Sequence, residues 1–152
     1  GTTPLSAASL TKVATSLAAL QTFGADHRFE TVLATTGTVE NGVVKGDLIV
    51  QGNGDPFFVW EEAIAVGNAL NQMGIKQVTG DLIIVGRFFM NFETDPGKSG
   101  NLLKQGLNSK TWSGEAAAQY QTLPPGTPKP TVAIAGDVKL ATAPPSNATG
   151  LV

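Results

Sequence analysis

Residues 38–52, TVENGVVKGDLIVQG, place the pair Asn41-Gly42 between two runs rich in β-branched residues. Asn-Gly is the strongest short signal for a β-hairpin, because both residues tolerate the positive φ angles of a type I′ turn. The string GDLIV at 46–50 returns as GDLII at 80–84. Two strands are therefore expected to begin alike, although two short copies do not make a repeat protein.

The segments around this hairpin have strand and helix patterns in turn. Residues 28–37, RFETVLATTG, and 76–86, KQVTGDLIIVG, are predicted strands. Between them, residues 60–74, WEEAIAVGNALNQMG, have the pattern of an amphipathic helix that Gly74 would end. The expected buried face of this helix consists of Ala63, Val66, Leu70 and Met73.

The pattern weakens from about residue 87. Residues 87–100, RFFMNFETDPGKSG, mix aromatic and turn residues, and residues 114–123, GEAAAQYQTL, suggest a short helix. Residues 131–142, TVAIAGDVKLAT, alternate like a last strand or hairpin. The sequence thus predicts an α+β fold, with a small mixed sheet, hairpins and one or two packed helices.

The composition excludes several classes of protein. The chain has 152 residues, 41% of them hydrophobic and 14% charged, which suits one domain, or one domain with a piece of another. A net charge of −2 without a run of Lys or Arg argues against a nucleic-acid partner. No apolar run is long enough to span a bilayer and no signal-peptide pattern is found, so we expect no transmembrane segment.

Cysteine and histidine usage narrows the chemistry further. The sequence has no cysteine, which excludes disulfides, thiol catalysis and Cys-ligated zinc. His27 is the one histidine, so a two-His metal motif is excluded and a Ser-His-Asp triad has little support. We expect a plain surface role for His27.

The stretch SAASLTKVATSLAAL at 6–20 is the candidate for chemistry. Residues 8 to about 23 have the pattern of a helix that Gly24 would stop. Residues three apart lie on the same helix face, so Ser9 and Lys12 can touch. The apolar face of this predicted helix consists of Leu10, Val13, Leu17 and Leu20.

A Ser-x-x-Lys pair can support nucleophilic catalysis. A serine hydroxyl needs a neighbouring base, and a lysine can serve if desolvation or a second cation keeps its amine partly neutral. Ser9 in the first helical turn would also gain positive dipole potential where an acyl oxyanion forms. The plainer interpretation is a helix cap, since Ser-x-x-Lys strings often arise by chance.

The order of several motifs resembles one known family. Three segments, 8–31 (ASLTKVATSLAALQTFGADHRFET), 39–56 (VENGVVKGDLIVQGNGDP) and 68–89 (NALNQMGIKQVTGDLIIVGRFF), are similar to the D-alanyl-D-alanine carboxypeptidase/endopeptidase family of low-molecular-mass penicillin-binding proteins. The resemblance covers about residues 4–92 well and the rest loosely. In it, Ser9 matches the acylated serine and Lys12 matches its base.

This sequence departs from the family pattern in what it lacks. Ala7 replaces the usual proline before Ala-Ser, and the turn after the helix reads QTFG where the family has Leu-Gly. The family site also needs a Ser-x-Asn motif and a Lys-Thr-Gly strand, both beyond a large inserted domain. SGN at 99–101 and KTW at 110–112 look like these motifs. We interpret both as chance matches, because little chain separates them and Trp112 replaces the required glycine.

The resemblance therefore implies a fragment. Residues 1–24 would be the nucleophile-helix part of a truncated catalytic domain, and residues 25–152 the inserted accessory α+β domain. The parent would be a serine-type carboxypeptidase or endopeptidase of the bacterial periplasm or cell envelope. It would act on peptidoglycan stem peptides through an acyl-enzyme at Ser9, bind β-lactams, and need no metal or organic cofactor. This chain alone is expected to be inactive, since the opposite wall of the cleft is missing.

A non-catalytic function is the alternative. The inserted domain would then bind the cell wall, act as a spacer, or promote self-association through the apolar face of helix 8–23. A group of aromatic residues near two loop junctions suits core packing, or a patch that docks the catalytic domain or cell-wall glycan. The group consists of Phe57, Phe58, Trp60, Phe88, Phe89 and Phe92.

Overall fold

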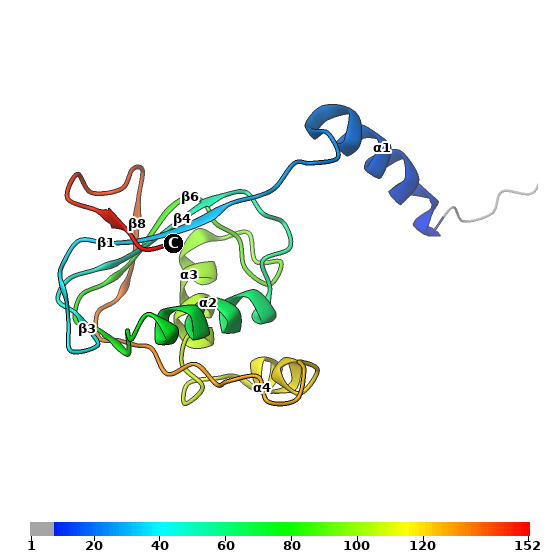
Figure 1. Ribbon diagram of the computed structural model, residues 1–152. Coiled ribbons are helices and arrows are strands. Elements are labelled where there is room, and N and C mark those ends of the chain that lie inside the picture. Colours follow the sequence, from blue (N-terminus) through cyan, green and yellow to red (C-terminus); the bar gives the residue numbers. More distant parts are fainter. Residues whose placement is uncertain (1–7) are drawn as a thin grey trace, which may run out of the picture.

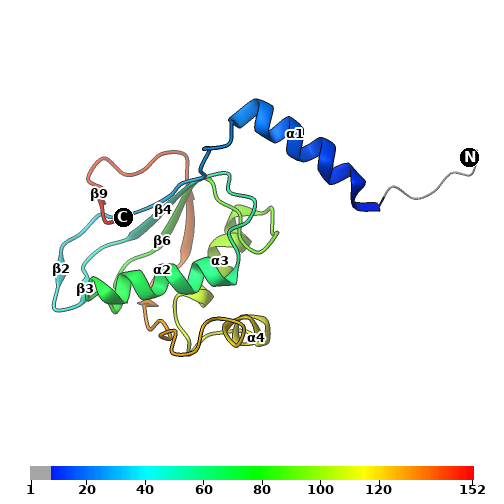
Figure 2. The same ribbon diagram turned by 45° about the vertical axis from the view of Figure 1, so that its right-hand side comes forward.

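Residues 8–152 are described by a computed structural model, in which helix α1 stands apart from the layered remainder of the chain (Figures 1 and 2). The helical elements are the 3₁₀ turn η1 (Ala8–Leu10), α1 (Thr11–Phe23), α2 (Trp60–Gln72), α3 (Pro96–Gly106) and α4 (Gly114–Tyr120). The strands are β1 (Thr31–Thr35), β2 (Val39–Glu40), β3 (Val43–Val44), β4 (Leu48–Asn53), β5 (Gln77–Val78), β6 (Leu82–Arg87), β7 (Ala133–Ile134), β8 (Val138–Ala141) and β9 (Thr149–Gly150). Ala7, where the family pattern has proline, lies outside the described residues.

The predicted Asn41-Gly42 hairpin is confirmed. It joins β2 to β3, which pair antiparallel with Val39 opposite Val44. Asn41 has a φ of 51° and Gly42 a φ of 80°, as a type I′ turn requires. The chain then enters β4, which pairs antiparallel with β1.

The strands of residues 8–152 form two mixed sheets, where the sequence predicted one. The longer sheet has the order β8-β6-β4-β1-β9 and the shorter one β2-β3-β5-β7. Strands β4, β6 and β8 run parallel, and so do β3, β5 and β7. The α+β class is confirmed. The predicted strand at 76–86 is divided into β5 and β6, and residues 131–142 are divided in the same way into β7 and β8.

A glycine ladder joins the two sheets. Each short parallel strand passes through a Gly-Asp pair into a long one, at 46–47, 80–81 and 136–137. The backbone N–H of Gly80 donates to the carbonyl of Gly46 at 2.9 Å, and that of Gly136 donates to the carbonyl of Gly80 at 2.8 Å. The ladder therefore continues the backbone pairing through the point where the chain changes sheets.

The aspartates of these pairs form a second ladder. Asp47 Oδ1 accepts from the backbone N–H of Asp81, and Asp81 Oδ1 accepts from that of Asp137, each at 2.8 Å. Side chains thus brace the three parallel strands at their starts. The sequence analysis matched two of these units. The third, GDVKL at 136–140, carries the same Gly-Asp signal and was missed.

The Asp81 carboxylate makes stability depend on pH. Lys139 Nζ lies 2.5 Å from Asp81 Oδ2, and this hydrogen bond, followed by the one from the Asp137 N–H, lowers the pKa of Asp81 below its ordinary 3.8. A pKa lowered in the folded state stabilises the fold above the ordinary value, and this stability is lost as the pH falls through the folded-state value.

We expect Asp81→Asn to unfold more easily than wild type near neutral pH and to approach wild-type stability as the pH falls below about 4. Urea unfolding measured along a pH series would test this. Asp26→Asn, in the exposed loop after α1, is the matched control and should follow the wild-type curve. A constant gap between the Asp81→Asn and wild-type curves at all pH values would contradict the prediction.

Helices α2 and α3 contribute to a single core beneath the long sheet (Figure 1). Alternate residues of β4 and β6 belong to this core, among them Leu48 and Leu82. The predicted helix α2 is confirmed, with Ala63 and Leu70 fully buried. The prediction for Met73 is wrong. It is 45% exposed, because α2 ends at Gln72 and Met73 occupies the C-cap position.

Helix α3 was not predicted from the sequence. Its glycine-rich segment, PGKSGNLLKQG, has a low intrinsic helix propensity. Asp95 caps its start by accepting from the N–H of Lys98 at 2.8 Å. At Gly100 a Cβ would lie 2.5 Å from Val138 Cγ1, so the glycine allows α3 to pack closely on the sheet. With the predicted α4 also present, three helices pack in the domain instead of one or two.

Helix α1 lies outside this core, although its existence and its stop at Gly24 are confirmed. None of its residues is buried, and its one extensive contact in residues 8–152 is with η1. Gly24 has a φ of 83° and its N–H donates to the carbonyl of Leu20 at 2.9 Å. Within the same residues no helix has the length and apolar character to cross a membrane.

Candidate functional site

Ser9 and Lys12 stand at the free end of the projecting helix. Ser9 is the middle residue of η1, and Lys12 is the second residue of α1. Both are exposed to solvent. Ala8, immediately before Ser9, has a φ of 42°, a left-handed conformation that is uncommon for a residue other than glycine. Ser9 and Lys12 are thus three residues apart across the junction of η1 and α1, and the contact between their side chains stays a prediction.

The apolar stripe of α1 runs along the same helix and is uncovered. Large apolar side chains that repeat at helical spacing are normally buried inside a protein. The exposed fractions are 71% for Leu10, 67% for Val13, 56% for Leu17, 55% for Leu20 and 54% for Phe23. A helix with this face is built to pack against another surface, and the described domain does not supply it.

An aromatic cluster marks the junction between α1 and the domain. The His27 ring stacks on Phe23 at 4.8 Å and meets Phe29 edge-on at 4.8 Å. His27 is exposed, as predicted, and it also packs between these two rings. The start of β1 is tied to the end of β4 by a hydrogen bond from the Glu30 N–H to Asn53 Oδ1 at 2.9 Å.

The SGN and KTW segments have structural roles. Ser99 is fully buried in α3, where its hydroxyl accepts from the Met90 N–H and donates to the Glu93 carbonyl. Thr111 donates from its hydroxyl to the carbonyl of Asn108 at 2.9 Å, and Trp112 Nε1 donates to the carbonyl of Gly106 at 2.9 Å. These contacts shape the turn after α3.

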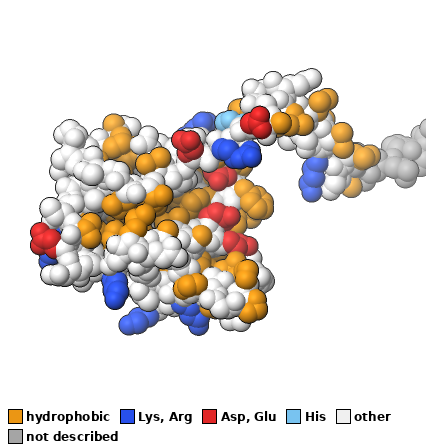
Figure 3. Space-filling model, viewed as in Figure 1, with side chains coloured by type: hydrophobic (Ala, Val, Ile, Leu, Met, Phe, Trp, Pro, Cys, Tyr) orange, Lys and Arg blue, Asp and Glu red, His pale blue; other side chains and the backbone are white. Residues whose placement is uncertain are grey.

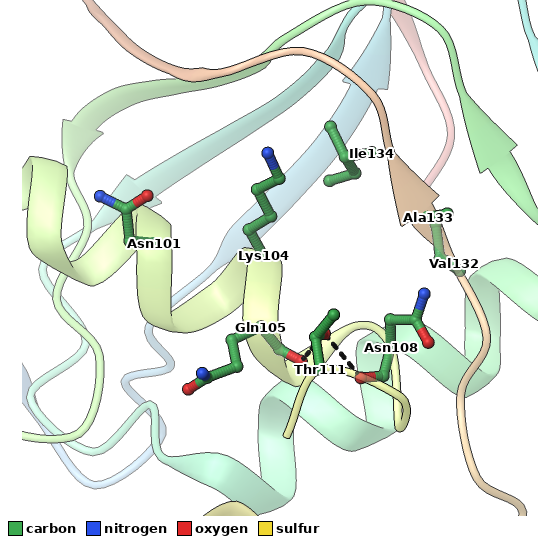
Figure 4. A pocket seen from close by; sticks show the side chains of 8 residues that line it. All are labelled: Asn101, Lys104, Gln105, Asn108, Thr111, Val132, Ala133 and Ile134. Atoms are coloured by element: carbon green, nitrogen blue, oxygen red, sulfur yellow. Dashed lines mark hydrogen bonds between the residues drawn. The ribbon is translucent and has the colours of Figure 1, made fainter. Parts of the chain in front are cut away.

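Asn101 of the SGN segment and Thr111 of the KTW segment line the same pocket, which Figure 4 shows. It has a volume of about 280 Å³ and lies between α3 and β7. Lys104 is the positively charged residue of the lining. Its Nζ donates to the carbonyl of Gly136, the last glycine of the ladder, at 2.5 Å. Ser9 is not part of this pocket. The lining residues are Asn101, Lys104, Gln105, Asn108, Thr111, Val132, Ala133 and Ile134.

Two acidic residues, Glu62 and Asp55, cap local backbone turns. Glu62 Oε2 accepts from the N–H of Val59 at 3.1 Å at the start of α2, and Asp55 Oδ1 accepts from the N–H of Phe57 at 2.8 Å. In the part of the chain that the structure describes, no three His, Asp or Glu side chains are grouped to hold a metal ion.

The aromatic group divides into core and surface. Phe58, Trp60 and Phe88 are buried, which confirms core packing for these three. Phe57 and Phe92 are 67% and 73% exposed and meet edge-on, with ring centroids 6.4 Å apart. Sequence reasoning could not separate the two sets, because buried and exposed aromatics alternate within the same short loops.

A Ser-x-x-Lys sequence at the start of an uncovered helix, followed by an α+β domain, is the arrangement that the sequence resemblance implies. Residues 1–115 match the model of the D-Ala-D-Ala carboxypeptidase 3 (S13) family. The chain therefore belongs to this family, as the motif order in the sequence indicated.

The relatives agree with this assignment. D-alanyl-D-alanine carboxypeptidase DacB of Haemophilus influenzae is 33% identical over 109 residues. These residues cover 72% of this chain and 23% of DacB, so the chain spans less than a quarter of that relative.

Solved structures share the fold. A variant form of the predatory endopeptidase Bd3459 from Bdellovibrio bacteriovorus has a TM-score of 0.69 at 21% identity, over 97% of this chain and 40% of that one. Penicillin G-acylated Bd3459, in complex with immunity protein Bd3460, has a TM-score of 0.61 at 22% identity, over 97% and 39%. At these identities the likeness concerns the fold alone.

Proposed function

We propose that this chain holds the nucleophile helix and the inserted accessory domain of a serine-type D-Ala-D-Ala carboxypeptidase or endopeptidase. Residues 1–24 belong to its catalytic domain and residues 25–152 to the accessory domain. The observation that carries the proposal is α1, which presents Ser9 and Lys12 on a helix whose apolar stripe is uncovered. The parent acts on peptidoglycan, in the bacterial envelope outside the cytoplasm.

The path of the chain supports an inserted domain. Strand β9 pairs antiparallel with β1, with Ala34 opposite Gly150. The Val152 carbonyl accepts from the N–H of Leu33 at 2.6 Å. A chain leaving along β9 therefore runs back beside β1 toward α1. A domain whose two connections lie side by side can be inserted into another domain without disturbing it.

In the proposed reaction, Ser9 Oγ attacks the carbonyl carbon of the terminal D-Ala–D-Ala bond while its proton passes to Lys12 Nζ. Lys12 then protonates the amine of the departing D-Ala as the C–N bond breaks, which leaves an ester on Ser9. Water hydrolyses this ester and restores the serine. The N-terminal end of the helix adds positive potential near the developing oxyanion.

The isolated chain lacks the surroundings that this reaction needs. Lys12 is exposed in residues 8–152, so the desolvation that keeps a lysine amine neutral must come from the rest of a catalytic domain. A missing oxyanion-hole donor alone lowers the rate by about 10²–10³-fold. Without the opposite wall of the cleft, we propose that this chain does not turn over substrate.

Intact-mass measurement after incubation with penicillin tests both parts of the proposal. We expect no mass gain on residues 1–152. A form extended past Val152 through a Ser-x-Asn and a Lys-Thr-Gly motif should gain the mass of one penicillin. Ser9→Ala should abolish the gain, whereas Ser16→Ala, an exposed serine on the same helix, should retain it.

Failure of the predicted inactivity and failure of the predicted catalytic role would give different results. A mass gain on residues 1–152 that Ser9→Ala removes would show that the isolated chain is active. An extended form that stays unmodified, while its circular dichroism shows that it is folded, would contradict the catalytic proposal and leave the accessory function as the alternative.

A further inference from the structure

A second pocket lies on the accessory domain, where the chain leaves β4 and β6. We call it the Phe92 pocket. Its volume is about 350 Å³, and its lining combines an exposed aromatic ring, two amide side chains and one carboxylate. The lining residues are Trp60, Asn91, Phe92, Glu115, Ala118 and Gln119.

Trp60 lines the pocket and has a buried donor without a partner in the part of the chain that the structure describes. The residue is 3% exposed, and its buried Nε1 has no hydrogen-bond partner within residues 8–152. The other tryptophan, Trp112, donates from its Nε1 to the Gly106 carbonyl. A buried N–H without a partner costs about 1–3 kcal/mol, so a small shift of the pocket wall that lets an outside acceptor reach this N–H would be favourable.

A strained turn holds Phe92 at the edge of the pocket. Asn91 and Phe92 have φ angles of 52° and 65°, a conformation that a bulky aromatic residue rarely adopts. The turn is fixed by hydrogen bonds from the Asn91 N–H to the Phe58 carbonyl at 2.8 Å and from the Glu93 N–H to the Met90 carbonyl at 3.0 Å. Such strain persists where the display of a side chain is useful. Here it keeps the ring exposed beside that of Phe57.

The chemistry of the lining selects a sugar over a peptide. The C–H face of a pyranose packs on an exposed aromatic ring, while its hydroxyl and acetamido groups pair with amides and a carboxylate. Glu115 is the one charged residue of the lining, and no Lys or Arg is present there. An acidic stem peptide would meet a like charge at Glu115, whereas a neutral sugar would not.

We propose that the Phe92 pocket binds N-acetylated sugar residues of a glycan strand, with the pyranose face on Phe92 and the polar groups of the sugar on the amide and carboxylate side chains of the lining. The source of this glycan, peptidoglycan, rests on the proposed function. Figure 3 shows hydrophobic and acidic side chains gathered on the side of the domain that faces the α1 arm.

The test is an NMR titration of residues 1–152 with the tetramer of N-acetylglucosamine. The two tryptophans give two indole N–H signals, and Trp112→Phe identifies that of Trp60. We expect the Trp60 signal to shift with saturation below about 10 mM sugar. Phe92→Asn removes the ring but keeps a residue that tolerates the left-handed turn, and should weaken binding about tenfold.

Leu140→Asn is the matched control, because it replaces an exposed apolar residue on β8 by the same residue. It should bind the sugar as wild type does. An unshifted Trp60 signal, or equal affinity in Phe92→Asn, would overturn the proposal. A shift caused by a stem tetrapeptide and not by the sugar would overturn it in favour of a peptide site. None of these outcomes depends on acylation of Ser9, so the proposed function is tested separately.

Discussion

Lys12→Met, in the form extended past Val152, is expected to slow the acylation of Ser9 by penicillin by about 10²–10⁴-fold. A serine hydroxyl is a poor nucleophile without a base, and Lys12 is the one residue that the motif places one helical turn from Ser9. The rate of mass gain at fixed penicillin concentration gives the measurement.

Two further variants test whether Lys12 acts by accepting a proton, through its positive charge, or only through the stability of the fold. Lys12→Arg keeps a positive charge but offers a group that does not deprotonate, so it should be as slow as Lys12→Met. Lys98→Met removes an exposed lysine of α3 and should acylate at the wild-type rate. If Lys12→Arg acylates at the wild-type rate, Lys12 acts through its charge and the base assignment is wrong.

Gly80→Ala should destabilise the fold strongly, because it places a methyl group inside the glycine ladder. A Cβ at this position would lie 2.2 Å from Asp47 Oδ1 and 2.7 Å from the backbone carbonyl of Gly46. The carbonyl cannot move without breaking the bond that it accepts from the Gly80 N–H. We expect a loss of about 1–3 kcal/mol in the free energy of unfolding, which lowers Tm by roughly 3–10 °C.

Gly114→Ala is the matched control for this substitution. A Cβ at Gly114 meets nothing within 4 Å, and the residue begins α4. Alanine there should leave Tm unchanged or raise it slightly, because it is the better helix former. Thermal unfolding followed by circular dichroism compares the two variants. Equal Tm values would mean that the ladder adjusts to a methyl group and does not fix the sheet.

Sequence patterns were sufficient where the signal was local. The Asn41-Gly42 turn depends on the φ angles of two residues, and α1 and α2 depend on apolar residues at helical spacing. The family assignment also came from the sequence, because several motifs in a fixed order are far more specific than Ser9 and Lys12 alone. These features need no knowledge of distant contacts.

Tertiary packing decided the rest. Helix α3 forms from a glycine-rich segment because Gly100 allows it to pack against Val138. Helix propensity, which is a local property, does not include this contact. Two sheets replace one because three strands change sheets at their Gly-Asp pairs, and each pair bonds to a counterpart more than thirty residues away. Met73 became exposed because the helix ended one residue earlier than its periodicity suggested.

The sequence by itself determined the family, the first hairpin and helix α1, and it predicted the Ser9–Lys12 pair at the start of that helix. The tertiary structure alone decided that the helix lies uncovered, that β9 returns beside β1, and that Phe92 and Trp60 line one pocket. The physical reason is the range of the interactions. Turn and helix signals act over a few residues, whereas burial, strand pairing and pocket lining depend on residues that meet after the chain has folded.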